Sequence, residues 1–227
     1  MNGIYLTIDS SAHASVALVD AVNGTVLAER TSPAPNDQTE TLNAYVAELL
    51  DDQQIQGSAL AGIIVGVGPG PFTGLRVGLV AARTFAYVWS VPLNGVMSLE
   101  ALVQRVLDAD VQVPSEFVVA ADARRRELYW ARFDASGTLL EGPRVGAADT
   151  LPALPVYGAG AGLYPEQLEE AGAQPVASSA DWLAEAALLG RRGLQFLADG
   201  VDLSDTAPRY LRESDAQVPA FMRKAQA

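Results

Sequence analysis

The chain has 227 residues, 49% hydrophobic and 19% charged, a composition that supports a buried core and excludes a predominantly disordered chain. It has no cysteine and one histidine, His13, which excludes disulfides, thiolate metal sites and histidine-rich metal centres. The formal net charge of −12 disfavours nucleic-acid binding by the chain alone.

The N-terminus lacks the features of a signal peptide, and no run approaches the roughly 18 apolar residues of a membrane span. We therefore expect a cytoplasmic protein that does not contact a membrane.

The first residues predict three antiparallel strands. The runs 3–9, 15–20 and 25–29 are rich in β-branched and apolar residues, and Asn23-Gly24 separates the second run from the third. An Asn-Gly pair between two apolar runs is a strong hairpin signal, because both residues tolerate positive φ.

Two helices and two strands are expected next. Asp37 is placed to cap a helix whose apolar stripe comprises Leu42, Tyr45, Val46, Leu49 and Leu50. Residues 62–67 suit a strand covered on both faces, and a second helix is expected over residues 74–89. A strand over 91–96 and a helix that Ser98 caps, ending near residue 107, complete this half.

The second half begins near residue 108. Strands are expected over 116–122 and 127–133, joined by the turn Ala123-Arg124-Arg125-Arg126, and a short strand over 154–157. Ser179 is placed to cap a helix over 181–198 that Gly200 ends. The arginine turn is read first as a solvated hairpin tip, with contact to an acidic partner or RNA as the rival interpretation.

Strand–strand–strand–helix–strand–helix is the half-module of the ribonuclease-H-like fold. That fold underlies actin, Hsp70 and the sugar kinases, so the pattern predicts an α/β protein in which mixed sheets are flanked by helices. The predicted domains are an N-terminal lobe over 1–107 and a smaller C-terminal lobe over 108–227. Whether the terminal helix packs back on the first lobe stays open.

Two segments are candidate phosphate sites. Asp9-Ser10-Ser11 follows the first strand, where hydroxyls and N–H groups can face phosphate and the carboxylate can hold Mg²⁺; an ordinary Asx-turn is the alternative. Residues 66–76 form a glycine- and proline-rich loop between a strand and a helix. This loop has neither the P-loop lysine nor the dinucleotide spacing, and its prolines remove N–H donors, so a rigid structural turn is equally plausible.

The sequence Gly66-Val67-Gly68-Pro69-Gly70-Pro71-Phe72-Thr73-Gly74-Leu75-Arg76 resembles the signature G-x-G-P-G-S-F-T-G-[LV]-R of the bacterial TsaB (YeaZ) family. Further stretches match in order, namely Ile8-Asp9-Ser10-Ser11, Gly95-Val96-Met97-Ser98-Leu99-Glu100-Ala101-Leu102, Ala121-Asp122-Ala123-Arg124 and Pro208-Arg209-Tyr210-Leu211-Arg212. The chain departs from the family at Pro71, where serine is common, and at Gln38-Thr39, where the family often has His-Thr.

The resemblance implies the two-lobed, actin-like (ASKHA) fold and a non-catalytic scaffold that binds and activates TsaD. Such proteins support formation of N6-threonylcarbamoyladenosine at position 37 of tRNAs reading ANN codons. They act with TsaD and TsaE, form a homodimer when alone, and meet tRNA only through the complex. The resemblance implies no cofactor or metal in this chain and leaves ATP or ADP at the complex interface open. The alternative is a small ATP-using phosphotransferase of the same fold, which Asp9-Ser10-Ser11 motivates.

The resemblance also suggests which residues to examine. It places the partner interface on the helices of the first lobe, with candidates Leu42, Tyr45, Val46, Leu49, Leu75, Leu79, Ala82 and Arg83. The sequence does not tell which of these face a partner rather than their own core. A vestigial phosphate-facing set would comprise Asp9, Ser10, Ser11, Gly68, Gly70 and Thr73.

Overall fold

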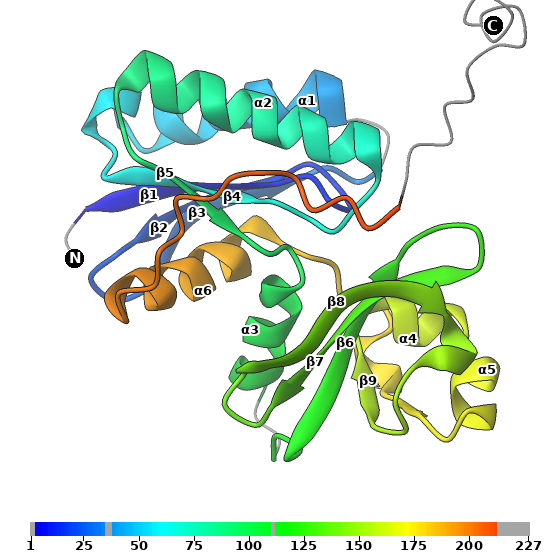
Figure 1. Ribbon diagram of the computed structural model, residues 1–227. Coiled ribbons are helices and arrows are strands. Elements are labelled where there is room, and N and C mark those ends of the chain that lie inside the picture. Colours follow the sequence, from blue (N-terminus) through cyan, green and yellow to red (C-terminus); the bar gives the residue numbers. More distant parts are fainter. Residues whose placement is uncertain (1–2, 35–37, 110–111, 213–227) are drawn as a thin grey trace, which may run out of the picture.

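Two five-stranded mixed sheets, each flanked by helices, form the framework of the protein (Figure 1). The computed structural model describes residues 3–34, 38–109 and 112–212. The two-lobed, actin-like α/β arrangement expected from the sequence is confirmed.

The first sheet has the order β3-β2-β1-β4-β5, in which β1 pairs antiparallel with β2 and parallel with β4. Its strands are β1 (Ile4–Asp9), β2 (Ser15–Asp20), β3 (Val26–Thr31), β4 (Gly62–Gly66) and β5 (Leu93–Val96). The hairpin predicted at Asn23-Gly24 is present, and Gly24 adopts φ +71°. The three N-terminal strands are therefore confirmed.

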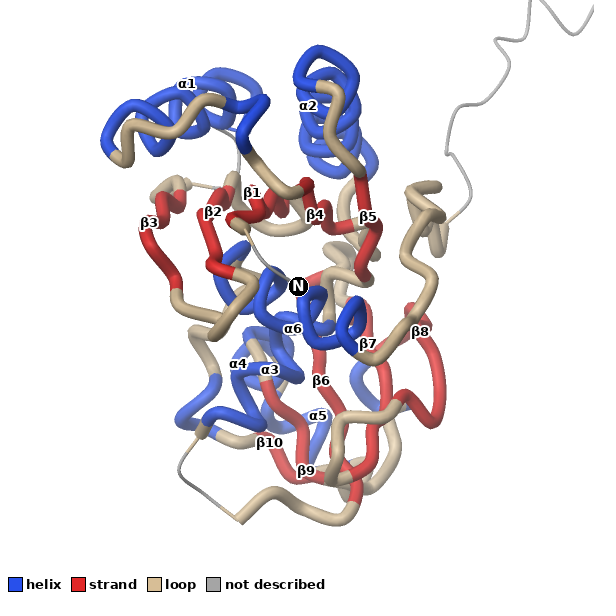
Figure 2. Tube along the Cα trace, turned by 90° about the vertical axis from the view of Figure 1, so that its left-hand side faces the viewer, coloured by secondary structure: helices blue, strands red, loops and turns tan. Residues whose placement is uncertain are grey.

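Helices cover both faces of this sheet (Figures 1 and 2). Figure 2 shows α1 (Gln38–Asp52) and α2 (Phe72–Trp89) on one side and α6 (Ala186–Ala198) on the other. Ile63 packs in the core beneath α1 and α2, whereas its neighbour Ile64 packs beneath α6. Every residue of β4 is buried, as expected for a strand covered on both faces.

The second sheet has the order β10-β9-β6-β7-β8 and repeats the pairing pattern of the first. Its strands are β6 (Glu116–Asp122), β7 (Glu127–Asp134), β8 (Leu139–Ala147), β9 (Pro155–Tyr157) and β10 (Gln174–Pro175). Its core is formed on one side with α3 (Glu100–Asp108) and on the other with α4 (Ala159–Leu163) and α5 (Pro165–Glu170). Short 3₁₀ turns lie at Gly57–Ala59, Ala148–Thr150 and Ala177–Ser179.

Two predicted helix caps are wrong. Ser98 does not cap α3, because its hydroxyl donates to Asp9 Oδ2 and accepts from Gly68 N. Ser179 lies before a non-helical stretch, and α6 begins only at Ala186, whose N–H donates to Ser15 Oγ on β2. The predicted cap at Asp37 lies outside the described residues.

The helices α3 and α6 link the two halves of the molecule. The α3 residues Leu102 and Val103 pack in the core of the second sheet, whereas α6 packs on the first. Arg192 of α6 forms a buried ion pair with Glu100 of α3 at 2.9 Å, and its guanidinium also donates to the carbonyl of Gly137. The domain boundary between residues 107 and 108 stays a prediction.

An extended segment after α6, residues 201–212, is called the strap here. It runs past the outer edge of β5 and ends near the turn between β6 and β7 (Figure 1). Leu203 accepts a hydrogen bond from Gly95 N at 2.7 Å, and Arg209 N donates to Val67 O at 2.8 Å. Arg212 forms an ion pair with Glu127 at the start of β7. The strap therefore contacts both sheets.

Candidate functional site

Asp9 lies at the end of β1, where the glycine loop closes over it. Ser11 donates to Asp9 Oδ1 from both its N–H, at 2.8 Å, and its hydroxyl, at 2.6 Å. Ser98 donates to Asp9 Oδ2 at 2.6 Å and accepts from Gly68 N at 3.1 Å. The carboxylate thus joins β1 to the glycine loop and to the segment before α3.

Ser10 binds the neighbouring helix. Its hydroxyl donates to Gly74 O at 2.8 Å and accepts from Gly78 N at 3.1 Å, so it bridges two backbone groups one turn apart in α2. A Cβ at Gly78 would lie 2.3 Å from Ser10 Oγ. A Cβ at Gly66 would lie 1.8 Å from Asp9 Oδ2. Glycine at these two positions is therefore explained by close packing against Asp9 and Ser10.

The Asp9 side chain is sealed from solvent. The residue is 0% exposed, and burial raises the pKa of its carboxyl above the usual 3.8, although hydrogen bonds from Ser11 and Ser98 oppose that rise. A buried carboxylate with both oxygens engaged is poorly placed to hold a Mg²⁺–phosphate group arriving from solvent. Within the described ranges no three His, Cys, Asp or Glu side chains form a group able to hold a metal.

The six candidate phosphate-facing residues do not converge on one cavity. A cavity of about 340 Å³ lies beside the glycine loop and reaches the second sheet, with Pro69, Leu99, Tyr129 and Trp182 among its lining residues. Of the six candidates only Ser11 lines it. Gly68 and Gly70 are buried, and Thr73 lines a different groove, between α1 and α2. At the edge of the cavity Arg124 pairs with Asp122 at 3.0 Å.

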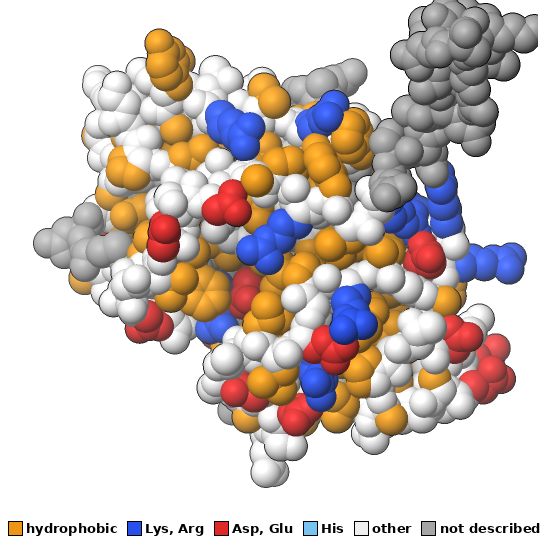
Figure 3. Space-filling view, in the orientation of Figure 1, with side chains coloured by type: hydrophobic (Ala, Val, Ile, Leu, Met, Phe, Trp, Pro, Cys, Tyr) orange, Lys and Arg blue, Asp and Glu red, His pale blue; other side chains and the backbone are white. Residues whose placement is uncertain are grey.

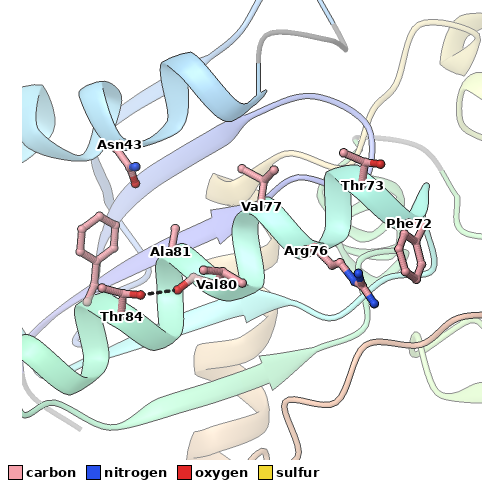
Figure 4. Close-up of a pocket in the computed structure, with 9 residues that line it drawn as sticks. Asn43, Phe72, Thr73, Arg76, Val77, Val80, Ala81 and Thr84 are labelled. Carbon is pink, nitrogen blue, oxygen red and sulfur yellow. Dashed lines mark hydrogen bonds between the residues drawn. The ribbon is translucent and has the colours of Figure 1, made fainter.

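A second candidate site is an apolar groove along α2. A groove of about 570 Å³ is lined by Asn43 of α1 and by α2 residues that include Val77, Val80 and Ala81 (Figure 4). In Figure 4, Val77 and Ala81 project from α2 on the side of α1, and Asn43 projects toward α2. The α2 side chains Val80, Tyr87 and Val88 are 62%, 87% and 65% exposed. Exposed apolar side chains beside an apolar groove are typical of an interaction surface.

The residues predicted for a partner interface divide into two groups. Six are buried in the core of this chain, each no more than 3% exposed, and offer no side-chain surface to a partner: Leu42, Val46, Leu49, Leu75, Leu79 and Ala82. Tyr45 is half-buried. Arg83 is exposed, and its guanidinium donates to the carbonyl of Thr206 in the strap at 2.8 Å.

The exposed face of α2 was not among the predicted interface residues, because the candidates on this helix were chosen mainly from the apolar stripe that is buried in the structure. Phe72, Arg76, Val80 and Thr84 recur every four residues and line the groove. Helical spacing of that kind was visible in the sequence, and apolar residues outside the buried stripe were the available signal.

One end of the α2 face carries a cation–aromatic stack. The Arg76 guanidinium lies 3.6 Å from the centre of the Phe72 ring, and its Nε donates to the Tyr210 hydroxyl at 3.1 Å. The Phe72 and Tyr210 rings are 4.9 Å apart between centres. The strap is therefore anchored at the rim of the groove.

In the part of the chain that the structure describes, no helix has the length and apolar character needed to cross a membrane.

Comparison with known sequences gives a consistent set of relatives. The model of the TsaD family, described as tRNA N6-adenosine threonylcarbamoyltransferase, matches residues 32–181. An uncharacterised protein of Mycobacterium tuberculosis is 38% identical over 158 residues, which cover 68% of this chain and 71% of that protein. The tRNA threonylcarbamoyladenosine biosynthesis protein TsaB of Bacillus subtilis is 31% identical over 137 residues, 60% of this chain and 57% of that protein. An uncharacterised Mycobacterium leprae relative, 37% identical, matches over 63% of this chain but only 39% of its own length.

Solved structures agree with these relatives. YeaZ from Pseudomonas aeruginosa superposes with a TM-score of 0.75 and 27% identity, covering 92% of this chain and all of that chain. A second Pseudomonas aeruginosa structure, described as similar to peptidase YEAZ, gives a TM-score of 0.77 and 28% identity over the same share of each chain. On the ordered motifs, the shared fold and these matches, the chain belongs to the TsaB (YeaZ) family.

Proposed function

We propose that this chain is a non-catalytic subunit that binds and activates a TsaD-type threonylcarbamoyltransferase. The complex would form N6-threonylcarbamoyladenosine at position 37 of tRNAs that read ANN codons. The printed role of the Bacillus subtilis and Escherichia coli TsaB relatives in tRNA threonylcarbamoyladenosine biosynthesis supports this proposal, as does the TsaD-family match.

The exposed apolar face of α2 is the observation that carries the proposal. Val80, Tyr87 and Val88 are mostly exposed beside a groove between two helices, which a helical partner surface can fill. Burial of apolar surface releases roughly 25 cal/mol per Å², so covering this face would favour association. The same face would serve a homodimer when the TsaD-type partner is absent, and the complex would also include TsaE.

Non-catalytic status is supported by the sealed carboxylate. Asp9 is the residue on which the alternative, an ATP-using phosphotransferase, depends, and both of its oxygens accept hydrogen bonds within the protein. His13, the single histidine, is also hydrogen-bonded within the chain, because its Nδ1 lies 2.7 Å from the backbone carbonyl oxygen of Ser32. We therefore place catalysis on the partner subunit.

The test is a reconstitution with matched variants. Val80→Asp puts a charge on the exposed α2 face, and Val22→Asp puts the same charge on an equally exposed valine, 67% exposed, in the β2–β3 turn. Both variants should fold, because neither side chain is buried. We expect Val80→Asp to lower affinity for the TsaD-type subunit at least tenfold and to reduce modified adenosine in proportion, while Val22→Asp behaves as the unmodified chain.

The assay would combine the chain with TsaD, TsaE, tRNA, ATP and threonylcarbamoyl-AMP. Modification that proceeds equally well without this chain would refute the proposal. Hydrolysis of ATP by the purified chain alone, lost in Asp9→Asn, would instead favour the phosphotransferase alternative.

A further inference from the structure

The chain continues beyond the strap with a segment that carries its own apolar cluster. The structure describes residues up to Arg212, and residues 213–227, called the tail here, follow in the sequence. The tail begins with the acidic residues Glu213 and Asp215 and then contains the run Val218-Pro219-Ala220-Phe221-Met222. Burial of aromatic and aliphatic side chains is favourable, so this run is suited to an apolar surface.

The α2 groove is an apolar surface of this kind, and the strap ends beside it. Figure 3 shows apolar side chains in orange next to basic ones over α2, at the top of the molecule. The Tyr210 ring of the strap lies 4.9 Å from the ring of Phe72, which lines the groove. The tail therefore starts within a few residues of a side chain that already contacts the rim of the groove.

The tail is also long enough to lie along the groove. Phe221 is nine residues beyond Arg212, and an extended chain of that length spans up to about 30 Å. Phe72 and Val80 are eight residues apart on α2, which corresponds to a helical rise of about 12 Å. A short tether of this kind gives an effective concentration of the order of mM, which favours the tail over a free ligand of equal affinity.

The charges at the start of the tail complement the rim of the groove. Among the described residues that line the groove, Arg76 alone is charged. Its guanidinium lies over the Phe72 ring and donates to the Tyr210 hydroxyl, and both of these partners are neutral. Glu213 and Asp215 follow Tyr210 within five residues, so a carboxylate of the tail can reach this guanidinium before the apolar run enters the groove.

We propose that the tail of this chain folds back into the α2 groove, where Val218, Phe221 and Met222 cover the exposed apolar face, and that it competes there with the partner subunit. The competition rests on the proposed function, which assigns the same face to the TsaD-type subunit. Only chains with an open groove can bind the partner, so the tail lowers the apparent affinity by the fraction of chains that are open. The tail would also shield the apolar face from non-specific contacts until the partner binds.

The absence of cysteine makes this docking directly measurable, because an engineered pair of thiols has no competitor in the chain. Val80→Cys/Phe221→Cys places one thiol at the groove and one in the tail. The control is Arg126→Cys/Phe221→Cys, because residue 126 is exposed in the β6–β7 turn that Arg212 contacts, where an undirected tail would also collide with it. A disulfide requires Cβ atoms about 3.5–4.5 Å apart, so the Val80 pair should close within one chain at least tenfold faster than the control in a glutathione buffer.

The competition is measured with a second pair of variants. Phe221→Ser/Met222→Ser keeps the length of the tail and removes two of its apolar side chains, and Ala216→Ser/Ala225→Ser is the matched control. We expect the first variant to bind the TsaD-type subunit about threefold to tenfold more tightly than the unmodified chain, and the control to bind with unchanged affinity.

The two experiments separate this inference from the proposed function. If the Val80 pair closes no faster than the control, or forms a disulfide only between two chains, docking of the tail is overturned and the proposed function stands. Rapid closure combined with unchanged partner affinity of Phe221→Ser/Met222→Ser would support the docking and overturn the competition. If the unmodified chain does not bind the TsaD-type subunit, the proposed function and the competition both fail, whereas the disulfide rates of the isolated chain still decide whether the tail occupies the groove.

Discussion

The single carboxylate of Asp9 connects three segments that are far apart in the sequence. Its oxygens accept hydrogen bonds from Ser11 and Ser98, and Ser98 in turn accepts from Gly68 N of the glycine loop. Gly66 approaches the same carboxylate too closely for any side chain. The motif that a sequence comparison would read as a phosphate site is thus satisfied by contacts within the chain.

We predict that Asp9→Ala lowers the free energy of unfolding by about 2–4 kcal/mol, because it leaves the donors of the half-buried Ser11 and the buried Ser98 without an acceptor. Asp9→Asn should cost less, since its amide oxygen can still accept from Ser11. Urea unfolding of the three proteins measures this. A loss in Asp9→Ala no larger than in Asp9→Asn would contradict the hydrogen-bonding role.

The raised pKa of Asp9 gives its contribution a definite pH dependence. Because the folded protein binds this proton more tightly than the unfolded chain, stability from Asp9 is greatest below the ordinary pKa of 3.8 and falls as pH rises through the folded pKa. The unfolding free energy of Asp9→Asn should therefore gain on that of the unmodified chain as pH rises above the ordinary pKa of 3.8, over the pH range in which both proteins stay folded. A constant difference over that range would show that burial does not shift this pKa.

At the scale of elements, the periodicity of the sequence predicted which segments form helices and strands, but not which elements pack against one another. The strands over 3–9, 15–20, 116–122 and 127–133 were recovered because each is a continuous run of β-forming residues. The strand β8 was missed, since Gly142-Pro143 interrupts its pattern, and an edge strand tolerates this interruption. The helices α4 and α5 were missed because five or six residues carry no helical period.

The residues predicted for the partner interface show that periodicity does not identify packing partners. An apolar stripe on α1 or α2 indicates that one face is buried and does not identify what buries it. Leu42 and Leu79 proved to face their own sheet. Charge substitutions at these two positions would therefore unfold the chain and say nothing about a partner, which is why the exposed Val80 is the informative position.

The pair between α3 and α6 is predicted to be the most sensitive contact between elements. Burial raises the pKa of Glu100, and Arg192 opposes that rise, so the ionised pair is held against a desolvation cost. Arg192→Met should lower the unfolding free energy by about 3–5 kcal/mol, because it leaves Glu100 buried without its partner. The double variant Arg192→Met/Glu100→Gln should recover part of this loss in urea unfolding. No recovery would mean that packing rather than charge dominates.

At the scale of the whole molecule, the strap connects the first sheet, α2 and the β6–β7 turn. Its path depends on Gly95, where a Cβ would lie 2.2 Å from the carbonyl oxygen of Asp205. The Asp205 carbonyl belongs to the backbone, so it cannot rotate away as a side chain could. The strap therefore follows β5 only while residue 95 lacks a side chain.

We predict that Gly95→Ala displaces the strap and lowers the unfolding free energy by about 1–3 kcal/mol. Hydrogen exchange should report faster exchange at residues 201–212 and at Gly95 N, which loses Leu203 O as its acceptor. The nearby Gly200→Ala is the control, because a Cβ there meets nothing within 4 Å, although its φ of +77° adds a small local strain. Unchanged exchange in the strap of Gly95→Ala would contradict this account.

The path of the strap has a consequence for solubility. The strand β5 is the last in its sheet, and an outermost strand with open N–H and C=O groups invites a foreign strand to add to it. The hydrogen bond from Gly95 to Leu203 occupies that position with the chain's own backbone. Proteolytic removal of residues 201–212 would uncover the edge, and the shortened protein should then polymerise through strand addition.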